Sequence, residues 1–84
     1  MKRFTWTDKA KGELRQIDKQ QAMAILHALT DYAKTGQGDI KRLRGSTDWR
    51  LRVGDYRVRF EILRDDILRI LHVKHRREAY RQSS

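Results

Sequence analysis

The stretch between residues 49 and 62 holds the side chains in this chain that are best suited to chemistry. It reads Trp49-Arg-Leu-Arg-Val-Gly-Asp-Tyr-Arg-Val-Arg-Phe-Glu-Ile62, with apolar and charged residues alternating on both sides of a Gly-Asp step. In a β-hairpin this alternation places the apolar side chains on one face and the charged side chains on the other. The charged set consists of Arg50, Arg52, Arg57, Arg59 and Glu61. Four guanidinium groups on one face of a small sheet repel one another, so the pattern indicates an anionic partner, most simply a polyanion.

A second polar segment, Val73-Lys-His-Arg-Arg-Glu-Ala-Tyr80, follows an apolar run near the end of the chain. His75 stands beside Arg76 and Arg77, and Tyr80 follows five residues after it. Imidazole is the side chain that changes charge near neutral pH, which suits general acid–base catalysis. Two interpretations of His75 remain open: it transfers a proton, or it only contacts phosphate or backbone.

Glu61 is the one acid that shares the arginine-rich face. It either pairs with Arg59 or Arg52, or it acts as a general base. A metal site is not expected, because His72 and His75 have no third ligand near them in the sequence and the chain contains no cysteine. The sequence therefore predicts no metal and no cofactor.

An arginine-rich surface can promote the cleavage of RNA without a metal. RNA carries its own nucleophile, the 2′-hydroxyl group, so the protein needs to align this group with the adjacent phosphate and manage two proton transfers. Arginines stabilise the negative charge that develops on the phosphate oxygens, and a rigid sheet aligns the reacting atoms. A base can stack on Trp49 or Tyr80. Arg50, Arg52, Arg59 and Arg77 are the further residues predicted to bind RNA.

The distribution of charge supports a polyanionic partner. The chain has 84 residues and a formal net charge of +9. Residues 41–84 hold 13 Lys or Arg against 6 Asp or Glu, and 11 of these basic residues are arginines. Lysine would serve solubility equally well, whereas arginine suits planar contact with phosphate and stacking on bases. Nucleic acid or an acidic protein segment is the expected partner, and a solvated basic face is the alternative.

Length and composition limit the organisation of the chain. Eighty-four residues predict one domain, 1–84. The absence of cysteine excludes a disulfide scaffold and a thiol nucleophile. No apolar run approaches the length of a membrane-spanning helix, and the first residues lack the apolar core of a signal peptide. We therefore expect a soluble, cytoplasmic protein that has no contact with membranes.

The hydrophobic periodicity predicts an α+β fold in which two N-terminal helices pack on one face of a mainly antiparallel sheet of about four strands, in the order β-α-α-β-β-β. The expected strands are 1–7, 49–53, 56–63 and 67–73, with a further short strand at 40–44. The expected helices are 8–17, capped by Thr7 or Asp8, and a second helix from Asp18 to Gly36 that buries residues including Leu26. The apolar strand 67–73 is expected to be central and buried on both faces.

Three runs of residues resemble the RelE branch of the RelE/ParE toxin superfamily. They are Leu43-Arg-Gly45, Trp49-Arg-Leu-Arg-Val-Gly-Asp-Tyr-Arg-Val58 and Val73-Lys-His-Arg-Arg-Glu-Ala-Tyr80. The resemblance implies the toxin of a type II toxin–antitoxin system. It also implies a metal-independent endoribonuclease, an mRNA interferase that cuts mRNA in the ribosomal A site by 2′-hydroxyl attack. An antitoxin with an acidic segment would wrap this toxin, and operator DNA would be bound only through the complex.

The resemblance also assigns residues. It implies that Arg57 stabilises phosphate, that Arg76 is the arginine after the Val-x-His element, and that Tyr80 is the terminal aromatic residue. Arg50 and Arg52 stand where well-known ribosome-dependent members have lysines, and an arginine practically cannot exchange a proton. The general base is therefore sought among Glu61, His75 and Tyr80. Two alternatives remain: a ParE-like inhibitor that binds DNA gyrase, and a non-catalytic RNA-binding module.

Overall fold

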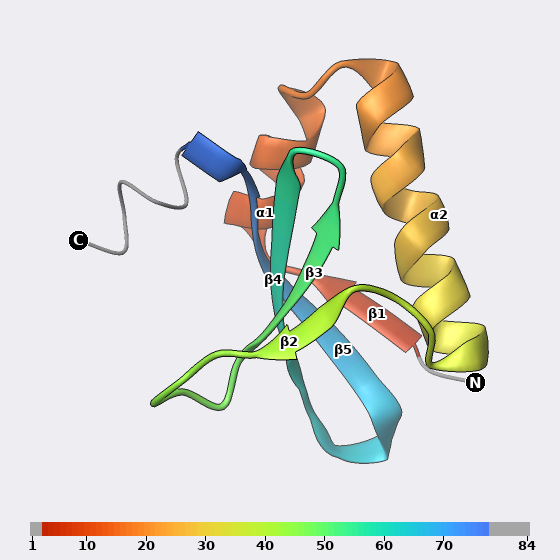
Figure 1. Ribbon diagram of the computed structural model, residues 1–84, viewed down its shortest axis with the longest axis vertical. Helices are drawn as coiled ribbons and strands as arrows, with labels where there is room; N and C mark the ends of the chain where they lie inside the picture. Colours follow the sequence, from red (N-terminus) through yellow and green to blue (C-terminus); the bar gives the residue numbers. More distant parts are fainter. Residues whose placement is uncertain (1–2, 78–84) are drawn as a thin grey trace.

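The computed structural model describes residues 3–77, and Figure 1 shows how their elements are arranged. In chain order the elements are β1 (Arg3–Trp6), α1 (Asp8–Arg15), α2 (Lys19–Thr35), β2 (Ile40–Arg42), β3 (Trp49–Val53), β4 (Tyr56–Ile62), a short 3-10 turn (Arg64–Asp66) and β5 (Ile67–His75). The predicted α+β fold is confirmed. The sheet has five strands, because the short segment at residue 40 forms the strand β2.

The five strands form one mixed sheet in the order β1-β5-β4-β3-β2. β1 runs parallel to β5, and every other neighbouring pair is antiparallel. β3 and β4 are joined by the predicted tight turn, in which Gly54 has a positive φ of 59°. Figure 1 shows α2 passing along one side of this sheet. The hairpin that carries the arginines is therefore in the body of the sheet, with β5 and β2 beside it.

Both helices begin at capping residues that the sequence indicated, and α2 also ends at one; α1 ends at Arg15, two residues before the predicted end. The Thr7 hydroxyl accepts a hydrogen bond from the Ala10 N–H at 3.1 Å, and the Asp18 carboxylate accepts one from the Gln20 N–H at 3.1 Å. α2 ends at Gly36, whose φ of 76° lies in the left-handed region that glycine adopts without strain. Asp18 and Gly36 thus mark the two ends of α2, and its buried residues Ile25 and Leu29 hold it against the sheet.

The hydrophobic core lies between α2, α1 and one face of the sheet. It consists of Ala10, Ile25, Leu29, Leu51, Val58, Phe60, Leu68, Ile70 and Val73. The prediction for Leu26 was wrong: this side chain lies on the outer side of α2, 36% exposed. Within residues 3–77, no helix combines the length and the apolar character needed to cross a membrane.

β5 is an interior strand, but it is not buried on both faces as predicted. The pairing of β4 with β5 shifts by one residue between Arg59 and Phe60, which pair with His72 and Ile70, respectively. Leu71 is therefore the extra residue of a β-bulge. The bulge changes the phase of the strand, so that Leu68, Ile70 and Val73 all enter the core while the polar residues between them face away. One face of β5 is apolar and the other is polar.

Candidate nucleic-acid interface

The strand register brings the four arginines of the hairpin together on the face of the sheet that α2 does not cover. Arg50 lies opposite Arg59, and Arg52 lies opposite Arg57. Their neighbours in sequence, such as Leu51 and Val58, point into the core on the other side. We call this surface, formed by Arg50, Arg52, Arg57 and Arg59, the arginine face. The sheet extends it sideways, since Lys41, His72 and Lys74 lie opposite Arg50, Arg59 and Arg57, respectively.

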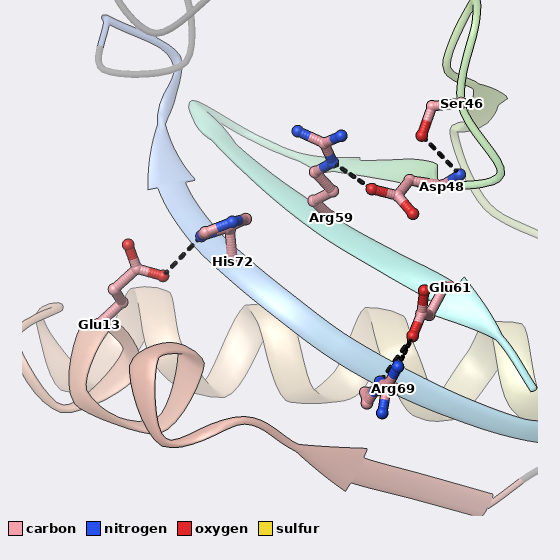
Figure 2. A network of polar contacts seen from close by, with 7 residues as sticks. All are labelled: Glu13, Ser46, Asp48, Arg59, Glu61, Arg69 and His72. Carbon is pink, nitrogen blue, oxygen red and sulfur yellow. Dashed lines mark hydrogen bonds and ion pairs between the residues drawn. The ribbon is translucent and has the colours of Figure 1, made fainter.

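Two arginines of this face are neutralised by carboxylates from loops. Arg52 Nε lies 2.5 Å from an oxygen of Asp39, and Arg59 Nε lies 2.7 Å from an oxygen of Asp48. Ser46 holds the second loop in place, because its hydroxyl accepts the Asp48 N–H at 3.1 Å, as Figure 2 shows. Because Asp39 and Asp48 already neutralise these two guanidinium groups, Arg52 and Arg59 do not need an external anion to balance their charge.

Arg50 and Arg57, the other two arginines, have no carboxylate partner among the described residues. Arg50 Nε and Arg57 Nη1 are shielded from solvent and make no hydrogen bond within the described part of the chain. They belong to diagonally related positions of β3 and β4, where side chains lie about 7–8 Å apart. A buried guanidinium nitrogen without an acceptor is costly, and phosphate oxygens are acceptors that it binds strongly. The arginine face therefore contains two cationic groups that an anion would satisfy.

Glu61 pairs with an arginine, but not with either of the two considered from the sequence. Both Nε and Nη2 of Arg69, its cross-strand neighbour on β5, donate to Oε1 of Glu61. Figure 2 shows this pair near the other end of the strands from His72. Neither Arg52 nor Arg59 contacts Glu61, because Asp39 and Asp48 bind them. The contact with Arg69 favours the ion-pair interpretation of this carboxylate.

The structure separates His75 from the arginine face. His75 lies opposite Tyr56, and the two rings meet edge to face with centroids 5.4 Å apart. Tyr56 packs against the core, so His75 belongs to the apolar side of the sheet. Its Nδ1 accepts the Arg77 N–H at 3.3 Å, which leaves Nε2 as the nitrogen able to carry the proton in the neutral ring. Whether His75 transfers a proton remains a prediction.

Trp49 also lies on the side of the core, where it pairs with Phe60 and packs against the buried cluster. Its ring is covered by the guanidinium of Arg42, 5.9 Å from the ring centroid. Trp49 therefore does not lie on the arginine face, and its position does not support stacking of an RNA base there.

The C-terminal arginines lie at the end of β5. Arg76 is exposed: its N–H donates to the Asp55 carbonyl at 2.7 Å, and its guanidinium lies 4.0 Å from the Asp55 carboxylate. Arg77 is exposed as well. Tyr80 lies outside the described residues. Arg76 and Arg77 are thus accessible to a ligand, while the role of Tyr80 remains a prediction.

A contact that sequence reasoning did not find joins α1 to β5. Glu13 accepts the Val73 N–H at 2.9 Å through Oε1, and its Oε2 lies 2.6 Å from Nζ of Lys74. Figure 2 shows Glu13 projecting from α1 toward His72, whose Nδ1 is 3.8 Å from Oε1. The segment that contains Lys74 was singled out by its motif, but nothing in the sequence pointed to a glutamate sixty residues earlier.

Burial is the largest cause that lowers the pKa of His72, and the positive charge of Lys9 lowers it further. Glu13 opposes these effects, while Lys74 and Arg59 add to them. His72 is therefore neutral at physiological pH. Among the described residues, no group of three or more His, Cys, Asp or Glu side chains could hold a metal ion.

The lowered pKa of His72 predicts a specific pH dependence of stability. The unfolded chain takes up this proton near pH 6.5, above the pKa in the folded state. The free energy of unfolding should thus be greatest above pH 6.5 and fall as the pH drops from there through the folded pKa. Urea unfolding at a series of pH values should show that His72→Gln removes part of this decrease. The exposed His27→Gln variant is the matched substitution for comparison, since it replaces a histidine of α2 that lies outside this cluster.

Comparison with solved structures identifies the fold. The RelB-RelE antitoxin–toxin complex from Methanococcus jannaschii matches with a TM-score of 0.76 and 20% identity, over 94% of this chain and 98% of that chain. The RelE-RelB complex from Pyrococcus horikoshii matches with a TM-score of 0.75 and 23% identity, over 89% and 94%. The isolated E. coli RelE toxin matches with a TM-score of 0.77 and 13% identity, over the full length of both chains. The fold is therefore that of RelE toxins.

The family model describes the "ParE toxin of type II toxin-antitoxin system, parDE" and matches residues 4–80. The chain thus belongs to this family, within the RelE/ParE superfamily of type II toxins that its motifs resemble. A search of curated proteins found no match.

Proposed function

We propose that this toxin is a metal-independent endoribonuclease that cuts mRNA in the ribosomal A site. The observation that carries the proposal is the pair of shielded guanidinium nitrogens, on Arg50 and Arg57, that lack an acceptor within residues 3–77. Their place on a rigid sheet, beside further cations, suits a phosphate whose charge increases during reaction. The fold shared with the RelE toxin, together with the motifs that resemble the RelE branch, supports the proposal.

In the proposed reaction, the 2′-hydroxyl oxygen of one nucleotide attacks the adjacent phosphorus, and the bond to the 5′-oxygen breaks. Arg57 and Arg50 bind the non-bridging phosphate oxygens, which carry more negative charge in the transition state than in the substrate. The exposed Arg76 and Arg77 contact the RNA backbone near the end of β5. The products are a 2′,3′-cyclic phosphate and a 5′-hydroxyl.

The groups proposed to move protons are His75 and Tyr80, because the third candidate, Glu61, is held by Arg69. His75 can reach the arginine face only around the end of β5, since it stands on the other side of the sheet opposite Tyr56. This placement makes it a weaker candidate than its position in the motif suggests.

We also propose that an antitoxin neutralises this cytoplasmic toxin. The solved structures from Methanococcus jannaschii and Pyrococcus horikoshii are toxin–antitoxin complexes. An acidic antitoxin segment that covers the arginine face would provide acceptors for Arg50 and Arg57 and would exclude RNA from them. Operator DNA would be bound through the antitoxin.

Cleavage of ribosome-bound mRNA is the direct test. Programmed ribosomes with bound mRNA are first assembled and chemically fixed, and free divalent ions are then removed with EDTA. Purified toxin should still cut the mRNA in these complexes. The new ends should be a 2′,3′-cyclic phosphate and a 5′-hydroxyl, identified by enzymatic end-labelling before and after phosphatase treatment. A hydrolytic, metal-dependent mechanism would leave other ends.

The same preparation should be assayed for inhibition of DNA supercoiling by gyrase, because the family model is that of ParE toxins. Intact mRNA together with blocked supercoiling would contradict the nuclease and favour a gyrase inhibitor. Binding of RNA without either effect would favour a non-catalytic module.

A further inference from the structure

The pair formed by Glu13 and Lys74 differs from the other ion pairs of the arginine face in its burial. The Lys74 side chain is 13% exposed and that of Glu13 is 16% exposed, whereas Arg52 and Asp39 are 53% and 47% exposed. An exposed ion pair such as Arg52 with Asp39 contributes little to stability and rearranges easily. Glu13 is in addition fixed by the Val73 N–H, so its carboxylate holds the ammonium group of Lys74 in a defined position.

The position of Lys74 is next to the group proposed to bind phosphate. Lys74 and Arg57 are direct cross-strand partners of β5 and β4, which places their Cα atoms about 4.5–5.5 Å apart. The bulge at Leu71 is responsible, because it turns Lys74 to the arginine face while Val73 stays in the core. Arg57 itself has a guanidinium nitrogen without an acceptor in the described residues.

Lys74 can also do what its arginine neighbours cannot. An ammonium group can give up a proton, whereas a guanidinium at physiological pH practically cannot. The other proton-exchanging groups on this side are less well placed. Lys41 is exposed on the edge strand β2, and His72 lies opposite Arg59, whose charge Asp48 already neutralises.

We infer that Lys74, positioned by Glu13, donates the proton to the 5′-oxygen that leaves when the RNA is cut. This inference rests on the proposed ribonuclease function. In this step the 2′-oxygen forms a bond to phosphorus and its proton passes to the base, for which His75 is proposed above, while the bond from phosphorus to the 5′-oxygen breaks. The 5′-oxygen takes a proton from the ammonium group of Lys74, and the resulting amine is protonated again by water. Glu13 is a positioning residue, since it acts through Lys74.

The test compares two short mRNAs on programmed ribosomes: one normal, and one with sulfur in place of the 5′-oxygen at the cleavage site. A thiolate leaves without a proton, because a thiol has a pKa near 8.5 whereas an alcohol is a far weaker acid. Lys74→Arg keeps the positive charge and should slow cleavage of the normal mRNA about 100-fold. The same variant should cut the sulfur-containing mRNA close to the wild-type rate. Lys34→Arg, in the exposed last turn of α2 and away from the arginine face, is the matched control and should behave as wild type with both.

Glu13→Gln provides a second variant, because its amide oxygen can still accept the Val73 N–H while the charge that holds Lys74 is lost. This variant should slow cleavage of the normal mRNA more than cleavage of the sulfur-containing mRNA. A purely structural role of Glu13 would not produce this difference. Equal slowing of both mRNAs by Lys74→Arg, or no slowing at all, would overturn the inference. If the wild type cuts neither mRNA, the ribonuclease function itself fails, and this result is distinct from the others.

Discussion

Replacing Arg57 with alanine is expected to relieve the growth arrest caused by the toxin when it is expressed without an antitoxin. Removing one group that stabilises charge in a transition state costs about 100-fold to 1000-fold in rate. The Arg57 side chain makes no hydrogen bond or ion pair within residues 3–77, so its truncation breaks no polar side-chain contact of the described fold. The free energy of unfolding should therefore fall by no more than about 0.5 kcal/mol, and any change beyond that should be an increase, because the substitution removes a shielded nitrogen that lacks an acceptor. Growth curves and urea unfolding of the purified variant measure the two effects.

Arg64→Ala is the matched control for this prediction, because it removes the same charge from an exposed turn outside the arginine face. It should leave the growth arrest unchanged. Arg57→Lys distinguishes charge from geometry: a lysine keeps the charge but cannot make the planar two-pronged contact of a guanidinium, so it should restore only part of the activity. An Arg57→Ala variant that unfolds, yet is as toxic per folded molecule as the wild type, would show that Arg57 serves the structure.

The arginine face was predictable because it depends on local order. The alternation around Arg50 and Arg59 has the period of a strand, and Gly54 marks the turn that folds one strand back on the other. Once the turn is fixed, the register follows, and with it the face on which each arginine stands.

The remainder of the site depends on features that have no local signal. The bulge at Leu71 adds one residue within an apolar run, so the sequence alone could not show that His72 and Lys74 share a face with Arg59 and Arg57. The alternation of side chains after the bulge also places His75 on the face of the sheet opposite the arginine face. The contact of Glu13 with Val73 joins residues sixty positions apart and depends on where α1 meets the end of β5.

The ion-pair partners of Arg59 and Glu61 could not be predicted from the sequence either. Arg59 binds Asp48, and Glu61 binds Arg69, because the loop before β3 and the strand β5 bring these groups within reach. Such partners are set by tertiary packing and side-chain length, and neither is encoded by the alternation of the hairpin.

Phe60→Ala is expected to have the largest effect on stability. Phe60 is fully buried, packs its ring against Tyr32 with centroids 5.7 Å apart, and stands next to the bulge that sets the phase of β5. Truncating a buried phenylalanine costs about 3–5 kcal/mol, a large part of the roughly 5–15 kcal/mol that stabilises a typical domain. Urea unfolding should show this loss directly, and toxicity should fall with the folded fraction.

Ile62→Ala is the matched control for this substitution, since Ile62 lies two residues further along β4 and is 40% exposed. It should cost much less, because part of its side chain remains in water in the folded state. At low temperature, where enough Phe60→Ala protein is folded, its cleavage rate per folded molecule should stay near that of the wild type if the arginine face keeps its register. A rate that falls per folded molecule, with Ile62→Ala unaffected, would instead mean that the packing of Phe60 at the bulge is what holds Arg59, His72 and Lys74 in their places.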